Sequence, residues 1–159
     1  MAIKIKWINL LLAILICQIA GIIGTIFTTP AIPIWYANLE KPFFSPPNWL
    51  FAPVWIILYT LMGISVYLIW ERGTKKKDVK SALLAFSGQL VLNSVWSIIF
   101  FGLKSPFYAF LIIVFLWLVI LLTIVKFYKL SKKAGLLLVP YILWVSFATV
   151  LNYYIWILN

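Results

Sequence analysis

The stretch EKPFFSPPNWLFAPVWIILY, residues 40–59, carries four prolines, two tryptophans and three phenylalanines at the approach to a hydrophobic run. Proline fixes φ and removes a backbone donor, so a cluster of prolines favours a stiff, irregular segment over a helix. The apolar residues that follow predict a helix that continues into a membrane. The stretch therefore predicts a rigid aromatic connection that leads directly into a membrane span.

The composition of the whole chain agrees with this prediction. The chain has 159 residues, of which 65% are hydrophobic and only 10% are charged. Soluble domains are about half apolar and about a quarter charged, so the composition indicates an integral membrane protein. Runs of about 20 apolar residues occur at 7–27, 50–70, 81–101, 107–127 and 135–158. We expect an all-α fold, in which residues 1–159 form one domain of five transmembrane helices joined by short loops and one long first loop.

Two other readings of the apolar runs are less consistent with the sequence. A secretory signal has an apolar core of roughly 7–15 residues followed by small residues at a cleavage site. The first run is longer and lacks such a site, so we expect it to remain as a helix. Strands of a membrane β-barrel alternate apolar and polar residues, and these runs do not.

The basic residues predict the orientation in the membrane. With five spans, the N-terminus shares a side with the second and fourth connections. Of the 13 basic residues, that side carries Lys4, Lys6, Arg72, Lys75, Lys76, Lys77, Lys80, Lys126, Lys129, Lys132 and Lys133, and the other side only Lys41 and Lys104. The positive-inside rule places the N-terminus in the cytoplasm and the C-terminus outside. Short basic loops at helix ends suit anionic lipid headgroups, so the net charge of +10 does not indicate nucleic-acid binding.

The spans lack the groups that several function classes require. The only acidic residues, Glu40, Glu71 and Asp78, lie in or beside loops, and histidine is absent. Proton relays and coupling-ion sites need ionisable groups within the bilayer, which speaks against a proton-driven transporter. The single cysteine, Cys17, has no partner for a disulfide or a metal site. We therefore expect no metal site, no required cofactor and no hydrolytic or acyl-transfer chemistry.

Aromatic and amide side chains recur at helical spacing in three spans. These stripes are Gln89, Asn93, Trp96 and Phe100; Tyr141, Trp144, Ala148 and Leu151; and Trp55, Tyr59 and Met62. A single stripe of this kind is most simply read as amides that join helices and aromatics that fill space. Three stripes that start near the same membrane face, below a stiff loop, make a ligand pocket more credible.

The nine tryptophans divide into two groups. Trp7, Trp70, Trp117 and Trp156 sit near span ends or on aliphatic helices, where tryptophan anchors a helix at the interface or packs against lipid. The candidates for a shared aromatic cavity are Trp35, Trp49, Trp55, Trp96 and Trp144.

Three blocks of sequence resemble the translocator protein (TspO/MBR) family, whose members are also called tryptophan-rich sensory proteins or peripheral benzodiazepine receptors. The first is WYANLEKPFFSPPNWLFAPVWIILY, residues 35–59. It matches the family pattern at Trp35, Tyr36, Leu39, Lys41, Pro42, Pro46, Pro47, Trp49, Pro53, Val54, Trp55, Leu58 and Tyr59. The other blocks are GQLVLNSVWSIIFFG in the third run and PYILWVSFATVLNYYIW in the fifth. Their order and spacing agree along essentially the whole chain.

The resemblance implies a five-helix membrane receptor that binds tetrapyrroles such as protoporphyrin IX, and also isoquinoline carboxamide and benzodiazepine drugs. It implies that the first loop covers the mouth of the pocket and that Trp55 and Trp144 flank the ligand. Asn93, Trp96, Ala148 and Leu151 match other pocket positions of the family. Together with the stripes, this gives the candidate ligand-binding residues Trp35, Tyr36, Trp49, Trp55, Tyr59, Gln89, Asn93, Trp96, Phe100, Trp144, Phe147, Ala148 and Leu151.

Three functions remain open at this point. The first is a receptor or sensor that binds porphyrin and aids its transport or disposal. The second is a light- and oxygen-dependent enzyme that degrades porphyrin, as the resemblance to some bacterial relatives implies, with Trp55 and Trp144 as its catalytic residues. The third is a membrane interaction protein without a ligand. Because the chain has no histidine, haem iron would need cysteine, methionine or tyrosine as its ligand, and we expect metal-free porphyrin to bind at least as well.

The sequence also bears on sterol binding, on dimerisation and on the membrane in which the protein lies. The proposed cholesterol motif needs a basic residue after its tyrosine, and none follows Tyr153, so sterol binding is doubtful. Small residues of the first run, such as Ala13 and Gly21, suit close helix contacts either inside a subunit or in a homodimer, which the resemblance favours. We expect a multi-pass protein of the plasma membrane in a prokaryote, or of the outer mitochondrial membrane in a eukaryote.

Overall fold

The computed structural model describes residues 5–159 and contains only helices and connections over that range. Five of its helical segments are long and apolar enough to cross a membrane. The all-α class and the five spans predicted from the apolar runs are thereby confirmed. Lys4, which the charge argument counted, lies outside the described residues.

The spanning segments are longer than the apolar runs. The first is α1 (Trp7–Ala31), and the second joins the 3₁₀ turn η2 (Asn48–Leu50) to α2 (Phe51–Trp70). The third is α3 (Lys77–Ser97) with the π-helical turn η3 (Ile98–Gly102), and the fourth is α4 (Pro106–Leu130). The fifth is α5 (Lys132–Leu137) followed by α6 (Val139–Leu158). A short 3₁₀ turn, η1 (Tyr36–Asn38), lies in the first connection.

Near two prolines, the helix ends in the structure differ from those predicted from the sequence. Pro30 lies inside α1, which continues to Ala31 instead of ending at residue 27. The fifth segment, read as one helix over 135–158, is divided at Leu138, and Pro140 lies in the first turn of α6. Proline cannot donate to the carbonyl four residues before it, but it is tolerated in a first turn, where that donor has no helical partner.

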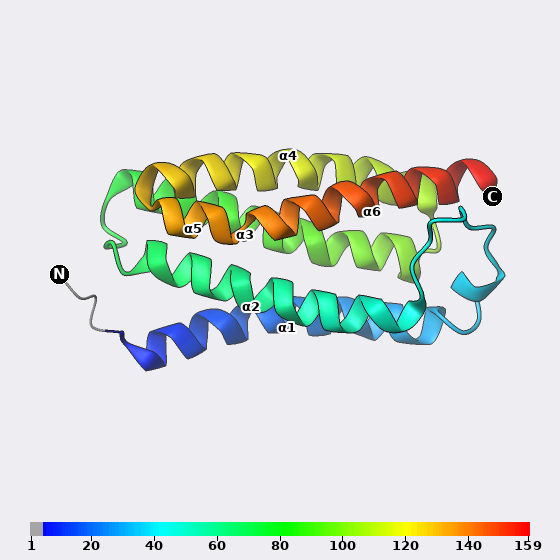
Figure 1. The fold of residues 1–159 in the computed structure, drawn as a ribbon, viewed down its shortest axis with the longest axis horizontal. Helices are drawn as coiled ribbons and strands as arrows, with labels where there is room; N and C mark the ends of the chain where they lie inside the picture. The colour runs from blue at the N-terminus through cyan, green and yellow to red at the C-terminus, as the bar shows by residue number, and fades with distance from the viewer. Residues whose placement is uncertain (1–4) are drawn as a thin grey trace.

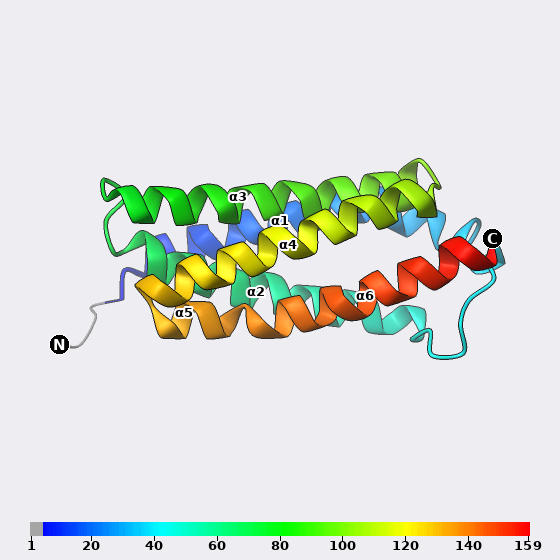
Figure 2. The same ribbon diagram turned by 90° about the horizontal axis from the view of Figure 1, so that it is seen from above.

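The helices form one bundle, with the start of α1 and the C-terminus at opposite ends (Figure 1). Helix α1 packs against α2 and α3, α3 against α4, α4 against α5 and α6, and α5 against α2. Figure 2 shows α3 along one side of the bundle and α5 and α6 along the other, with α4 crossing from the side of α3 towards α5. The long connection between α1 and α2 lies at the same end as the C-terminus, and we call this end the loop end.

Small residues of α1 pack inside the subunit. Ala13, Cys17, Ala20 and Gly24 are all buried. On the facing helix, a Cβ added to Gly63 would lie 2.5 Å from the Cα of Ile14, so α1 and α2 approach at backbone distance there. The small residues of α1 therefore serve contacts between helices of one chain.

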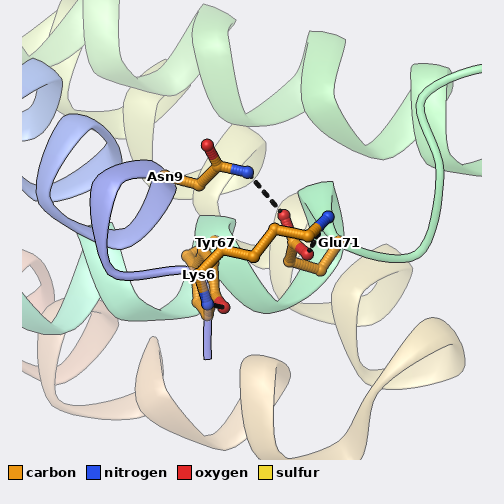
Figure 3. Close-up of polar contacts among 4 residues, drawn as sticks. All are labelled: Lys6, Asn9, Tyr67 and Glu71. Atoms are coloured by element: carbon orange, nitrogen blue, oxygen red, sulfur yellow. Dashed lines mark hydrogen bonds and ion pairs between the residues drawn. The ribbon is translucent and has the colours of Figure 1, made fainter. Parts of the chain in front are cut away.

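A polar cluster joins α1 to α2 at the end opposite the loop end (Figure 3). The ammonium group of Lys6 lies 2.9 Å from the Glu71 carboxylate, which also accepts a 2.9 Å hydrogen bond from the side-chain amide of Asn9. The backbone N–H of Lys6 donates to the Tyr67 hydroxyl at 3.0 Å. Glu71 thus links the start of the first span to the end of the second.

Candidate ligand-binding site

A cavity of about 410 Å³ opens inside the loop-end half of the bundle. Its walls come from the C-terminal half of α1, the start of α2, the end of α3 with η3, and the middle of α6. The lining residues are Gln18, Gly21, Ile22, Gly24, Thr25, Thr28, Thr29, Ile32, Tyr36, Asn48, Phe51, Ala52, Trp55, Ile56, Tyr59, Asn93, Trp96, Ser97, Phe101, Trp144 and Ala148. The volume lies within the range of small-molecule sites.

Trp55 and Trp144 line the cavity from different helices, and each ring is held by other aromatic side chains. The indole of Trp55 stacks on Tyr59, with ring centroids 5.4 Å apart and an angle of 28° between the planes. Trp144 meets Phe51 edge-on at 6.1 Å and Phe147 at 5.6 Å. Aromatic contacts of these geometries stabilise the ring positions. The cavity therefore has two supported indole walls.

A chain of hydrogen bonds forms one side of the cavity and extends into the core. The Tyr59 hydroxyl donates to the side-chain oxygen of Asn93 at 2.6 Å, and the Asn93 amide donates to the Tyr141 hydroxyl at 3.0 Å. Tyr141 in turn donates to the side-chain oxygen of Gln89 at 2.8 Å. All four residues are buried, and they connect α2, α3 and α6. Within residues 5–159, the Gln89 amide nitrogen has no hydrogen-bond partner.

Trp96 is fixed by a separate pair of hydrogen bonds. Its indole N–H donates to the side-chain oxygen of Asn152 at 3.0 Å, and the Asn152 amide donates to the backbone oxygen of Pro106 at 2.8 Å. The ring stacks on Phe100 at 5.3 Å. Asn152 therefore joins the ends of α3, α4 and α6 beside the cavity.

The π-helical turn brings a second phenylalanine to the site. The N–H of Leu103 donates to the carbonyl of Ile98, five residues earlier, at 2.9 Å. This wider turn places Phe101, five residues after Trp96, on the cavity wall. Phe100, at α-helical spacing from Trp96, is buried behind it. Single π turns are frequent at functional sites.

The connection between α1 and α2 covers the loop end of the cavity. Tyr36 lines the cavity, is buried, and packs against Phe100 and Phe101 at 6.3 and 5.8 Å. Burial raises the pKa of the Tyr36 phenol, so it is uncharged at neutral pH. Phe44 meets Phe147 at 6.2 Å and Tyr154 at 5.4 Å. These contacts attach the connection to α6.

Two reciprocal hydrogen bonds also hold the connection to the end of α6. The N–H of Glu40 donates to the Asn159 side-chain oxygen, and the Asn159 amide donates to the Glu40 carbonyl, both at 3.0 Å. The side-chain ammonium of Lys41 is used within the connection, where it donates to the Leu39 carbonyl at 3.0 Å and lies 4.9 Å from the Tyr36 ring centroid.

The candidate residues from the sequence divide into two groups in the structure. Those that line the cavity are Tyr36, Trp55, Tyr59, Asn93, Trp96, Trp144 and Ala148. Those that do not are Trp35, Trp49, Gln89, Phe100, Phe147 and Leu151. Trp49 is 71% exposed, while Trp35 and Phe147 pack against lining or supporting rings. Gln89, Phe100 and Leu151 are buried behind the wall.

Helix α1 contributes a wall that the sequence reading missed. Gln18, Gly21, Ile22, Gly24, Thr25, Thr28, Thr29 and Ile32 line the cavity but belong to no aromatic stripe. A Cβ added at Gly21 would lie 2.5 Å from the Tyr59 ring, so the glycine allows that ring to pack against α1. The feature of the sequence that could have indicated this wall is the presence of small and polar residues within an otherwise aliphatic run. The same reading missed Asn48, Phe51, Ala52, Ile56, Ser97 and Phe101.

The cavity is lined mainly by apolar side chains, with a few hydrogen-bonding groups among them. Within the described chain, none of the residues that line it is charged. Several lining hydroxyls already donate to protein oxygens, such as Thr25 to Gly21, Thr28 to Gly24 and Tyr59 to Asn93. Over residues 5–159, no three His, Cys, Asp or Glu side chains come together as metal ligands.

Comparison with known proteins shows which family this chain belongs to. The model of the TspO/MBR family matches residues 13–157. The chain is 45% identical over 152 residues to the tryptophan-rich protein TspO of Archaeoglobus fulgidus, covering 96% of this chain and 97% of that protein. It is 41% identical over 123 residues to the translocator protein of Sus scrofa, covering 77% of this chain and 73% of that protein. It is also 36% identical over 119 residues to the tryptophan-rich sensory protein of Cereibacter sphaeroides, covering 75% and 73%.

Proposed function

The chain belongs to the TspO/MBR family, and on that premise we propose that it is a membrane receptor that binds tetrapyrroles of the protoporphyrin IX class in the cavity. The observation that carries the proposal is a 410 Å³ cavity lined by Trp55, Trp96 and Trp144 without a charged side chain among the described lining residues. A porphyrin is a wide, flat π-system, and aromatic side chains bury such surfaces well. Isoquinoline carboxamide and benzodiazepine ligands are likewise largely aromatic and apolar.

The receptor would hold its ligand beneath the first connection and would aid transport or disposal of the porphyrin. The excess of basic residues at the N-terminal end supports an orientation with the N-terminus in the cytoplasm and the C-terminus outside. That orientation places the cavity in the outer half of the bilayer. A homodimer would have to use surfaces other than the buried small residues of α1, such as Ala13 and Gly24.

Binding can be tested by titration with protoporphyrin IX in the dark. Quenching of tryptophan fluorescence should saturate at one porphyrin per chain, because porphyrin absorbs where indole emits and the cavity holds one such ligand. Trp144→Ala should weaken binding by about tenfold, since it removes one aromatic wall. Trp117→Ala is the matched control, because Trp117 donates to Ser146 between α4 and α6 and does not line the cavity. Equal affinity of the two variants would contradict binding in this cavity.

A second candidate function is light- and oxygen-dependent breakdown of the porphyrin. The stacked contact of Trp55 with Tyr59 favours it, because it holds an indole at the cavity wall beside the bound porphyrin. The photoexcited porphyrin would take one electron from the indole and pass it to molecular oxygen, which forms superoxide. The indole radical would regain an electron from the porphyrin, and the oxidised porphyrin would combine with superoxide, so that porphyrin is oxidised and oxygen is reduced. Illumination of the complex followed by product analysis tests this candidate. Trp55→Phe and Trp144→Phe should keep binding within about threefold and abolish breakdown. Unchanged breakdown in both variants would exclude these tryptophans as electron donors.

A further inference from the structure

The cavity wall between α1 and α2 contains residues that also face the outside of the bundle. Ile22 on α1 and Ile56 on α2 both line the cavity, yet each is 58% exposed. Thr25, Thr29 and Ala52 line it as well and are exposed. Ile23 and Ile57, the chain neighbours of Ile22 and Ile56, are also exposed but do not line the cavity, so the outer surface of the bundle faces lipid at this place. The cavity therefore reaches the lipid-facing surface along the line between α1 and α2.

Towards the middle of the bundle, α1 and α2 are in contact and the cavity no longer reaches the surface between them. The side-chain amide of Gln18 donates to the Ile56 carbonyl at 3.0 Å and to the Thr60 hydroxyl at 3.1 Å, which ties the two helices together at that level. Further from the loop end, Gly63 allows backbone contact with Ile14. Gln18 thus marks the inner limit of the opening.

The water-facing end of the cavity is closed by a different set of contacts. Tyr36 is buried beneath the connection, Phe44 packs against α6, and Glu40 exchanges two hydrogen bonds with Asn159. A ligand that entered from water would have to break these contacts. A ligand dissolved in the bilayer would meet only the side chains of Ile22, Ile56 and their neighbours.

We propose that the cavity exchanges its ligand with the hydrocarbon phase through a lateral opening between α1 and α2, and that Gln18 sets the inner edge of this opening. The proposal rests on the proposed function, because it assumes that the cavity holds an apolar ligand. It adds the source of that ligand, which is the half of the bilayer at the loop end. The ligand class is accordingly one that partitions into membranes.

A thiol reaction tests the opening without any porphyrin. Ala148, on the α6 wall of the cavity, is replaced by cysteine in the full-length protein, and the buried native Cys17 is replaced by alanine. The protein is placed in lipid nanodiscs, where both membrane faces meet buffer. Labelling by lipid-soluble pyrenyl maleimide is compared with labelling by a water-soluble sulfonated maleimide. We expect the lipid-soluble reagent to react at least about tenfold faster, because the water-facing end is closed.

Two pairs of neighbouring isoleucines supply the variants and their matched controls. Ile22→Trp and Ile56→Trp place a large ring in the opening, and each should slow labelling by pyrenyl maleimide by about tenfold. Ile23→Trp and Ile57→Trp alter adjacent exposed residues that do not line the cavity, so their rates should stay within about twofold. Equal rates for the lining variants and their controls, or faster labelling by the water-soluble reagent, would overturn the proposal.

Protoporphyrin IX delivered from protein-free vesicles gives a second readout. Ile22→Trp and Ile56→Trp should slow the quenching of tryptophan fluorescence by the same factor as the thiol reaction, while Asn159→Ala should leave the quenching rate unchanged. A faster rate in Asn159→Ala would show entry beneath the connection and would overturn the proposal. An absence of quenching in the unmodified protein would contradict the proposed function, and the thiol rates would still decide whether the opening exists.

Discussion

The Tyr59 hydroxyl donates a 2.6 Å hydrogen bond to the side-chain oxygen of Asn93, and both residues line the cavity. This contact joins α2 to α3 and begins the chain that continues to Tyr141 and Gln89. The bond commits the Tyr59 proton to Asn93, so this hydroxyl has no proton left to donate to a ligand. The same residues thus hold the helices together and set the polarity of the site.

Removal of this contact should destabilise the fold. Tyr59→Phe leaves the buried Asn93 oxygen without its donor, and we expect a loss of about 1 kcal/mol in the free energy of unfolding. Unfolding by sodium dodecyl sulfate in mixed micelles measures this change. Tyr153→Phe is the control, because Tyr153 is exposed and should change stability by less than about 0.5 kcal/mol. A similar effect of both substitutions would mean that the Asn93 contact contributes little.

Replacement of two glycines by alanine should change the stability of the fold in opposite directions. Gly21→Ala would place its Cβ 2.5 Å from the Tyr59 ring, so we expect a loss of about 1–3 kcal/mol in stability and weaker porphyrin binding. Gly88→Ala would meet its nearest atom, on Val119, only at 4.0 Å. That change should raise stability by about 0.5–1 kcal/mol through helix propensity. Thermal unfolding in detergent distinguishes the two, and a stable Gly21→Ala would show that the Tyr59 ring can move aside.

The hydrogen bond from Trp96 to Asn152 should contribute to the affinity for porphyrin. Asn152→Leu removes the acceptor of the Trp96 indole and the donor to Pro106, so the ring loses its fixed position beside the cavity. We expect the dissociation constant for protoporphyrin IX to rise by about tenfold. Ser146→Ala is the control, because it removes the partner of Trp117 outside the cavity and should leave affinity unchanged. Equal losses of affinity would show that the effect is one of general stability.

The contact between Lys6 and Glu71 should make the stability of the fold depend on pH. The Asn9 amide and then the Lys6 ammonium lower the pKa of Glu71, and the hydrogen bond to Glu71 raises the pKa of Lys6. The contribution of Glu71 to the stability of the fold is present above the ordinary carboxyl pKa. It is lost as pH falls through the lowered pKa of Glu71. The Lys6 contribution is present below the ordinary lysine pKa and is lost as pH rises through the raised value.

Stability of the unmodified protein should therefore exceed that of Glu71→Gln at neutral pH, and the difference should shrink below about pH 4 and above about pH 10.5. Thermal unfolding across this range in low salt measures the difference. High salt should reduce it, because the Lys6 side chain is exposed to solvent. A difference that stays constant with pH would mean that the hydrogen bond from Asn9, and not charge, accounts for the contact.

Haem should bind without a protein ligand to its iron. Cys17 is buried and does not line the cavity, and the cavity-lining Tyr59 donates its proton to Asn93. Metal-free protoporphyrin IX should therefore bind at least as tightly as haem, because iron gains no axial ligand from these groups. Absorption spectra of the Soret band test this expectation. A coordination band that disappears in Cys17→Ala, Tyr36→Phe or Tyr59→Phe would contradict it.

Much of the site followed from helical spacing in the sequence. The stripes through Trp55, Asn93 and Trp144 lie on helices that the structure brings around one cavity, and Tyr36 joins them from the connection. Spacing within a helix gives the face on which a residue lies, but not the neighbour of that face. Gln89 and Leu151 share the stripes, yet they lie behind the wall because their positions face the core between helices.

The α1 wall and the π turn could not be read in the same way. Gly21 and Thr25 gain their importance from the helix that packs opposite them, and this partner is set by the tertiary arrangement. Phe101 reaches the cavity because the turn at Ile98 is one residue wider than an α-helical turn. Local sequence showed neither the wider turn nor the exposed line between α1 and α2.

The amino-acid sequence by itself determined the five apolar helices, the uneven distribution of basic residues and the stiff proline-rich connection, because each depends on local composition and chain stiffness. Only the tertiary structure decided that Trp55 and Trp144 line one cavity, that Asn159 holds the connection, and that Ile22 and Ile56 border an opening towards lipid. These features depend on which helices pack side by side. That choice is made by contacts between residues distant in sequence, such as Tyr59 with Asn93 and Gly63 with Ile14.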